Sequence, residues 1–166
     1  YDLWEERFAT HSYTVFITQA ALISAAKLAK AMDHNEQAES WARAAAKIEL
    51  GIRLLYDQQR QCYRKSVLLL ESGDLEFNNT IDSSSLYGAM SFYKNAEPEI
   101  LKNIASAVKT YLKQPNSIGG VSRYEHDSYF LRDKDSIGNP WIICTLWLAQ
   151  YMIRAGKTDE ALKEID

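Results

Sequence analysis

The chain has 166 residues, of which 46% are hydrophobic and 25% charged, with a formal net charge of −3 at pH 7. This composition is typical of one globular domain and excludes collagen-like, low-complexity and disordered chains. The longest apolar stretch, 141–153, is interrupted by Thr145 and Gln150, so no run reaches the roughly 18 residues of a membrane span. The mixed charge lacks the Lys/Arg stripe of nucleic-acid-binding proteins. We therefore expect neither membrane nor nucleic acid as a partner.

Helical spacing of apolar residues runs along most of the chain, separated by short polar breaks. The spacing predicts helices, in chain order, at 12–32, 36–56, 81–94, 97–113, 140–155 and 158–165. The first, third and fifth carry few charges, whereas the second, fourth and sixth each carry four or more. An apolar helix is buried and one with a charged face lies outside. The order is therefore inner, outer, repeated three times, as in an α-solenoid or a closed α/α toroid.

Two segments do not follow the helical pattern. Within 58–80, two apolar runs flank Gly73-Asp74, which predicts a short β-hairpin with Cys62–Leu68 in its first strand. The segment 114–139 is a long loop, and loops beyond about 12–15 residues are usually functional or disordered. Disorder is disfavoured by its aromatic and arginine content: Arg123, Tyr124, Tyr129, Phe130 and Arg132.

Neither cysteine nor histidine spacing indicates a metal site. Cys62 and Cys144 are isolated, so we expect small core thiols rather than a disulfide framework. His11, His34 and His126 lack ligand spacing with one another. No Gly-rich phosphate-binding loop is present. The sequence therefore predicts no metal and no cofactor.

Polar and aromatic residues gather in the segments that precede the three inner helices. These segments are 1–11, 78–83 and 123–141. If the inner helices run parallel, all three segments meet at one end and form a pocket of carboxylates, arginine and aromatic rings. Such a mixture suits sugars, because aromatic faces stack on a pyranose while acids and arginine bind its hydroxyls.

Trp4-Glu5 is a candidate general acid within this pocket. A carboxyl group packed against a tryptophan is disfavoured in its charged form and can remain protonated near neutral pH. The alternative is that Glu5 and Glu6 are ordinary acids at a helix entrance, near the positive end of the dipole. Spacing alone leaves both interpretations open.

Three motifs together resemble glycoside hydrolase family 15, the glucoamylases. They are Tyr1-Asp2-Leu3-Trp4-Glu5-Glu6, then Asp82-Ser83-Ser84-Ser85-Leu86, then Arg123–Tyr129 after Gly119-Gly120 and before Gly138-Asn139-Pro140-Trp141. They occur in the family's order and span nearly the whole chain. The resemblance implies an all-α fold, part of an (α/α)6 toroid with about three inner/outer helix pairs.

The resemblance also implies a reaction and residues that perform it. The reaction is inverting hydrolysis that releases glucose from α-glucans or oligosaccharides, with Glu5 as general acid. Substrate contacts are implied for Asp2, Trp4, Glu6, Arg123, Tyr124, Asp127 and Trp141. Glu125 and His126 are expected to be solvated loop residues, and Tyr129 to pack the loop. The charged insert 131–137 departs from the fungal pattern and leaves the shape of the pocket rim open.

We expect residues 1–166 to be a single partial domain of a longer protein. The resemblance places the general base, a glutamate, beyond the helices present here, so this chain alone is expected to be inactive. It is also expected to self-associate through inner helices that nothing covers.

Three alternatives remain at this stage. The first is a trehalase or dextran-directed glucosidase of the same family. The second is a regulatory toroid that binds glucan without cutting it. The third is a helical-repeat interaction module, although its units should be self-similar, and the loops here are unlike one another.

Overall fold

The fold is helical, as the sequence predicts. In the computed structural model, residues 1–115, 119–131 and 136–165 are described. This part contains α1 (Ser12–Ala31), α2 (Asn35–Leu55), α3 (Ser83–Phe92), α4 (Pro98–Leu112), α5 (Ile142–Arg154) and α6 (Thr158–Ile165). Each boundary lies within two residues of the expected one, because the polar breaks carry clear end signals. Pro98, for example, opens α4, where its missing N–H costs nothing, and Gly156 follows α5 with φ 76°.

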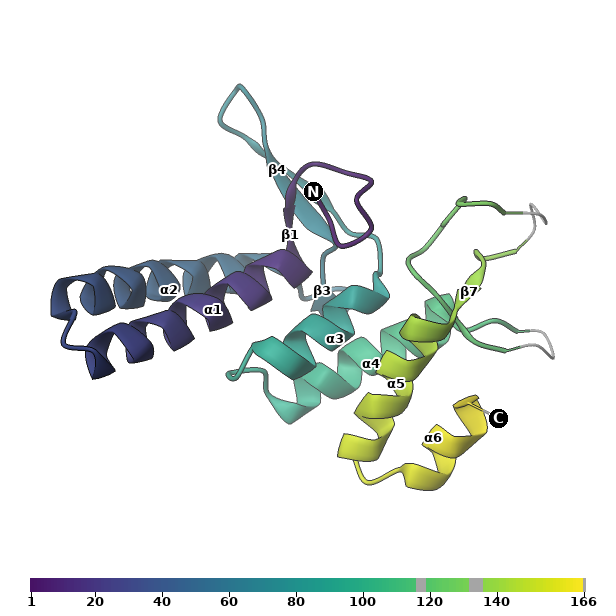
Figure 1. Cartoon of the computed structure of the whole chain (residues 1–166). Coiled ribbons are helices and arrows are strands. Elements are labelled where there is room, and N and C mark those ends of the chain that lie inside the picture. The colour runs from purple at the N-terminus through teal and green to yellow at the C-terminus, as the bar shows by residue number, and fades with distance from the viewer. Residues whose placement is uncertain (116–118, 132–135, 166) are drawn as a thin grey trace.

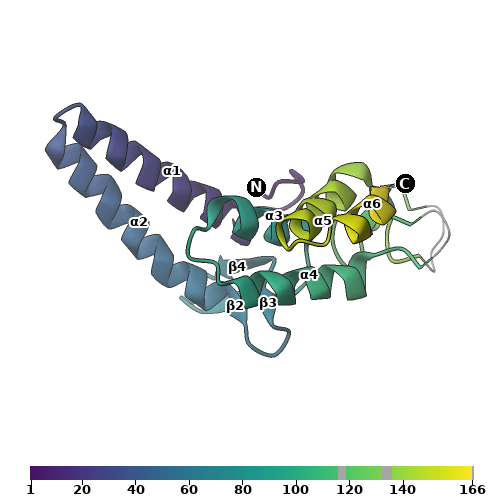
Figure 2. The same ribbon diagram turned by 90° about the horizontal axis from the view of Figure 1, so that it is seen from below.

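The helices are arranged as three successive hairpins. α1 packs against α2 and α3, α3 packs against α4 and α5, and α5 packs against α6. The low-charge helices α1, α3 and α5 are therefore neighbours, and each carries its charged partner, as Figures 1 and 2 show. This confirms the inner and outer alternation. α1 and α2 are 20 and 21 residues long against 10 for α3, so their far ends project as an arm (Figure 2).

The hydrophobic core lies where the hairpins meet. Its fully buried members come from nearly every helix and include Phe16, Ile52, Leu86, Val108 and Leu148. The two cysteines, Cys62 and Cys144, are also buried and free, which confirms them as core thiols. Burial raises the pKa of Cys62 to about 11 and that of Cys144 to about 12.

Short strands tie the loops together. β1 (Thr10–His11), β4 (Ser66–Leu69) and β5 (Leu75–Asn78) form an antiparallel sheet in the order β1-β4-β5. The hairpin predicted around Gly73 is thus confirmed for β4 and β5. Cys62-Tyr63, however, is not part of it: as β3 (Cys62–Tyr63) it pairs with β2 (Tyr56–Asp57). β6 (Val121–Ser122) pairs with β7 (Pro140–Trp141) and closes the base of the long loop.

Several large apolar side chains of the inner helices are exposed. They are Leu28 of α1 and Ile142, Ile143, Leu146 and Ile153 of α5. The self-association expected from such surfaces stays a prediction. Four residues of the 131–137 insert, 132–135, lie outside the described residues. No helix in the described ranges is long and apolar enough to cross a bilayer.

The close packing of α3 against α1 can be tested at Gly88 of α3. A Cβ atom there would lie 2.9 Å from Cδ2 of Phe16, which is fully buried and cannot move aside. For Gly88→Ala we expect a net loss of up to about 2 kcal/mol in unfolding free energy, because overpacking costs about 1–3 kcal/mol and the helix gains about 1 kcal/mol. Chemical denaturation measures this.

Gly51→Ala is the matched control. It lies within α2, and an added Cβ would meet nothing within 4 Å. This variant should gain about 0.5–1 kcal/mol. Equal effects of the two substitutions would contradict the packing described for α1 and α3.

Candidate active site

The segments before α1, α3 and α5 meet at one end of the helices, on the upper side in Figure 1. The indole Nε1 of Trp4 donates to Oδ2 of Asp82 over 3.0 Å. The hydroxyl of Ser83 donates to the carbonyl oxygen of Arg123 over 2.9 Å. The rings of Trp4 and Trp141 lie 6.3 Å apart between centroids. Each segment therefore contacts the other two.

Asp2 shapes the turn that carries the two glutamates. We call residues 1–7 the acid loop. Oδ1 of Asp2 accepts hydrogen bonds from the backbone N–H groups of Glu6 (2.8 Å) and Arg7 (3.4 Å). The backbone N–H of Glu5 donates to the carbonyl oxygen of Asp2 over 3.1 Å. Glu5 itself has φ 60°, a strained conformation that persists only where its surroundings fix it.

Arg123 is held by carboxylates from two segments. Its Nε and Nη2 each lie 2.7 Å from Asp127, in a bidentate pair, and Nη2 lies 2.8 Å from Oε1 of Glu6. Arg123 and Asp127 are 3% and 1% exposed. Burial alone would lower the pKa of Arg123, but Asp127 and Glu6 outweigh it and raise that pKa. The guanidinium therefore stays charged.

Tyr124 completes the contact with Glu6. Its hydroxyl donates to Oε2 of Glu6. Burial, and then this hydrogen bond, raise the pKa of Tyr124, so the hydroxyl stays a donor. Glu6 thus has one oxygen on Arg123 and the other on Tyr124.

Aromatic rings enclose the Arg123 guanidinium. Its Cζ lies between 4.8 and 5.4 Å from the ring centroids of Trp4, Tyr124, Tyr129 and Trp141. Behind them, the ring of Trp147 stacks on Tyr87 at 4.9 Å. The arrangement combines charged hydrogen-bonding groups with an aromatic wall, which suits a hydroxyl-rich, partly apolar ligand.

Lys65 was not among the predicted site residues, yet its ammonium group lies within the cluster. It is 5% exposed, and its Nζ lies 3.2 Å from Asp82 and 3.7 Å from Asp2. Nζ also lies 3.3 Å from the centroid of the Tyr124 ring. The signal available in the sequence was indirect: two acids expected at one buried end require a cation between them.

Glu125 corrects one expectation. It was predicted to be solvated, but it accepts two hydrogen bonds of 2.8 Å from Arg60 and one of 2.7 Å from the backbone N–H of Ile81. The loop that carries Glu125 runs beside the segment before α3 at this point, and spacing did not reveal that contact. His126 is exposed, as expected. The ring of Tyr129 lies 4.7 Å from that of Phe130 and also faces Arg123.

The surroundings of Glu5 differ from the expectation of a carboxyl enclosed against tryptophan. Glu5 is exposed, and its side chain makes no hydrogen bond or ion pair with the part of the chain that the structure describes. The physical reason is its place at the tip of the turn fixed by Asp2. The ring of Trp4 instead contacts Trp141 and Trp147. The role of Glu5 as an acid stays a prediction.

One groove lies apart from this end of the molecule. A groove of about 670 Å³ is lined by α1, α2 and Asn95 and includes none of the residues described above. Over the described ranges, no three His, Cys, Asp or Glu side chains gather as they would around a metal ion.

Comparison with known proteins decides the family. The sequence profile described as "Glycosyl hydrolases family 15" matches residues 1–164. The chain belongs to glycosyl hydrolase family 15. An uncharacterized glycosyl hydrolase of Methanocaldococcus jannaschii is 32% identical to this family 15 chain. The match covers the whole of this chain and 24% of that protein. It is 26% identical over 93% of its length to a probable glucoamylase of Schizosaccharomyces pombe, covering 34% of that protein.

Solved structures show the same fold. A bacterial glucoamylase complexed with acarbose matches 97% of this chain and 28% of its own, with TM-score 0.76 and 21% identity. The glucoamylase of Saccharomycopsis fibuligera matches 95% of this chain and 35% of its own, with TM-score 0.71 and 20% identity. The family 15 chain therefore has part of the glucoamylase α/α fold, and it spans about a quarter to a third of these relatives.

The Arg60–Glu125 anchor should make stability depend on pH. Burial tends to raise the pKa of Glu125, but the hydrogen bonds from Arg60 and Ile81 outweigh it and lower that pKa. A carboxyl group whose pKa is lower in the folded state stabilises the protein. This stabilisation is complete above the pKa of the unfolded state, about 4.3, and is lost as pH falls through the pKa of the folded state. The difference in melting temperature between wild type and Glu125→Gln should therefore be largest above about pH 5 and shrink below it.

Glu39→Gln serves as its control. Glu39 pairs with Arg43, but both side chains are mostly exposed, and such pairs contribute little. A wild-type advantage over Glu125→Gln that grows toward low pH would contradict the anchor.

Proposed function

We propose that the protein containing this chain is a glycoside hydrolase that releases glucose from α-glucans or oligosaccharides with inversion. Two findings support it: membership of glycosyl hydrolase family 15, and the turn of Trp4-Glu5-Glu6 beside Arg123 inside an aromatic wall. The second is the observation that carries the proposal for this chain's own residues. It supports the proposal because Glu5, which is exposed, lies in the chain between Trp4 and Glu6, and both of these residues contact Arg123.

In this proposal Glu5 is the general acid. Its exposed carboxyl is free of hydrogen bonds to the described residues, whereas Glu6 has both oxygens engaged by Arg123 and Tyr124. A proton donor must reach the glycosidic oxygen, and only the free carboxyl can do so without breaking existing contacts. Glu5 would thus give its proton to the leaving sugar oxygen as the glycosidic bond breaks.

The neighbouring residues would bind and orient the sugar. Arg123 has five N–H donors and its contacts with Asp127 and Glu6 fix the plane of the guanidinium. Trp4, Tyr124 and Trp141 surround it and offer faces for a pyranose ring. Asp2 shapes the acid loop. We propose that these five residues and Asp127 bind the substrate. Glu6 would join the acid loop to the loop that carries Arg123 and Tyr124.

The charge of the cluster suits the reaction. Four carboxylates, those of Asp2, Glu6, Asp82 and Asp127, pair with two cations, Lys65 and Arg123. A surplus of negative charge stabilises the oxocarbenium-like transition state of glycoside hydrolysis. Inversion needs a second carboxyl group, roughly 6.5–9.5 Å from the first, that activates water on the opposite sugar face. We propose that this base is a glutamate outside residues 1–166.

The test uses the full-length protein, with maltotriose and trehalose followed by proton NMR. Wild type should release β-glucose first from maltotriose, or equal amounts of β- and α-glucose from trehalose, because the leaving glucose of trehalose keeps its α configuration. The substrate that is cleaved separates a glucoamylase-like from a trehalase-like specificity. Glu5→Gln should lower kcat by about 10²–10⁴-fold, as expected for loss of a general acid, while oligosaccharide binding by calorimetry persists. Residues 1–166 alone should be inactive.

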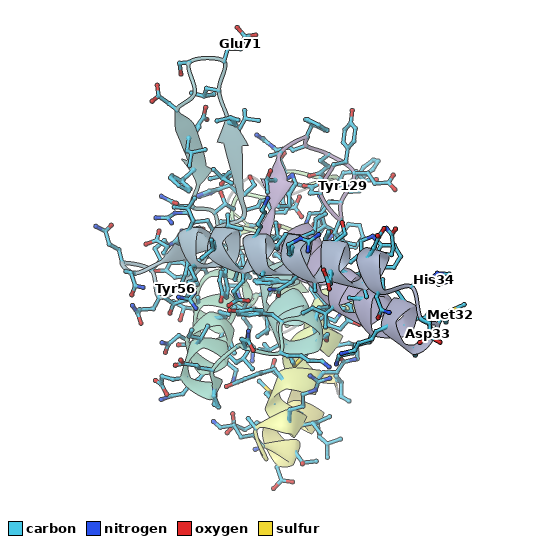
Figure 3. All side chains as sticks on the ribbon, turned by 90° about the vertical axis from the view of Figure 1, so that its left-hand side faces the viewer. Met32, Asp33, His34, Tyr56, Glu71 and Tyr129 are labelled. Atoms are coloured by element: carbon cyan, nitrogen blue, oxygen red, sulfur yellow. The ribbon has the colours of Figure 1, made fainter. Side chains whose placement is uncertain are left out.

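Glu71→Gln is the control for loss of a carboxylate. Glu71 lies at the tip of the β4–β5 hairpin, which stands away from the helices in Figure 3, so kcat should not change. Initial α-glucose from maltotriose, or α-glucose alone from trehalose, would disprove inversion. Binding without turnover in wild type would instead identify a glucan-binding regulator.

A further inference from the structure

Lys65 is buried between two carboxylates and an aromatic ring that belong to three different segments. Asp2 lies in the acid loop, Asp82 precedes α3, and Tyr124 precedes α5. The distances from Nζ are 3.7 Å to Asp2, 3.2 Å to Asp82 and 3.3 Å to the Tyr124 ring centroid. A cation over a tyrosine face is attracted to the ring as well as to the acids. One ammonium group thus joins all three segments of the site.

Each partner of Lys65 passes the contact on to the acid loop. Asp2 holds the backbone N–H of Glu6, and Tyr124 donates to the side chain of Glu6. Asp82 accepts the indole N–H of Trp4. Trp4 and Glu6, the residues on both sides of Glu5, are therefore fixed by groups that Lys65 contacts. Among the described residues, Lys65 makes no direct contact with Glu5 or Glu6.

The cation is required because of what surrounds it. Oδ2 of Asp2 is buried and has no hydrogen-bond partner among the described residues, so its nearest compensation is the Lys65 ammonium. Removing one member of a buried ion pair leaves an uncompensated charge. Without Lys65, Asp2 and Asp82 would lose the group that holds their carboxylates together, and the strained turn at Glu5 could relax.

We propose that Lys65 is a positioning residue for the reaction: through Asp2, Asp82 and Tyr124 it fixes the acid loop, and so the carboxyl of Glu5, against Arg123. The inference rests on the proposed function for its catalytic consequence. It assigns Lys65 no contact with the sugar. Misplacement of a reacting group by about 1 Å can cost about 10²-fold in rate, so the effect should fall on kcat rather than on KM.

The experiment compares Lys65→Met with Lys65→Arg in the full-length protein. Lys65→Met keeps the length of the side chain and removes its charge, and kcat should fall about 10–100-fold with KM changed less than about threefold. Lys65→Arg keeps the charge and the affinity for an aromatic face, and it should recover most of the lost kcat. Lys109→Met, which removes a half-exposed cation between α4 and α6, should leave kcat and KM unchanged.

A second readout reports the loop directly and does not depend on turnover. Protein labelled with 5-fluorotryptophan gives a ¹⁹F resonance for Trp4, identified by its absence in Trp4→Phe. The indole of Trp4 donates to the oxygen of Asp82 that Lys65 also contacts. The resonance should therefore shift in Lys65→Met, return toward its wild-type position in Lys65→Arg, and stay in place in Lys109→Met.

The outcomes separate the two proposals. If wild type cleaves no glucoside, the proposed function fails, while the Trp4 resonance still decides whether Lys65 fixes the acid loop. A Lys65→Met protein that melts earlier but keeps kcat within twofold and the Trp4 resonance unshifted would overturn the inference, since Lys65 would then be merely structural. If Lys65→Met does not fold, Lys65→Gln replaces it in the same comparisons, with the same two results deciding.

Discussion

The bidentate ion pair between Arg123 and Asp127 is the interaction on which the rest of this end of the molecule depends. Both groups are almost fully buried, and a buried charge is tolerated only when it is paired and hydrogen-bonded. Asp127 therefore also accepts the backbone N–H of Tyr129 over 3.0 Å. Asp127 fixes the orientation of the Arg123 guanidinium, and another part of its edge binds Glu6. Aromatic rings surround the same guanidinium.

The same requirement explains why three separate segments have one arrangement here. Lys65 forms ion pairs with Asp2 and Asp82, and Arg123 forms ion pairs with Asp127 and Glu6. Neither cation could remain buried if one segment moved away. The loops are therefore held by charge compensation, whereas the helices beneath them are held by apolar packing. Rigidity at the site comes from its polar groups, which is the condition under which preorganised electrostatics can lower a barrier.

The helices could be predicted from the sequence because their signals are local. Apolar spacing, Pro98 and Gly156 act within one turn of the chain, and the boundaries follow. The meeting of three loops also followed from parallel inner helices. Lys65 and Glu125 could not be found this way, because their partners are far away: Arg60 lies 65 residues from Glu125. Nor does a sequence pattern show which of two adjacent glutamates, Glu5 or Glu6, has its oxygens already occupied.

The distance along the chain between the parts of the site has a consequence for how the chain folds. The hairpin of α1 and α2 needs only neighbouring sequence, but the contact from Tyr124 to Glu6 spans 118 residues. Closing so long a loop is slow, because its entropy must be lost before the contact forms. During synthesis the acid loop emerges before Arg123 and Tyr124, the two residues that bind the Glu6 side chain. We therefore expect the contacts of Glu6 to form later than the α1–α2 hairpin.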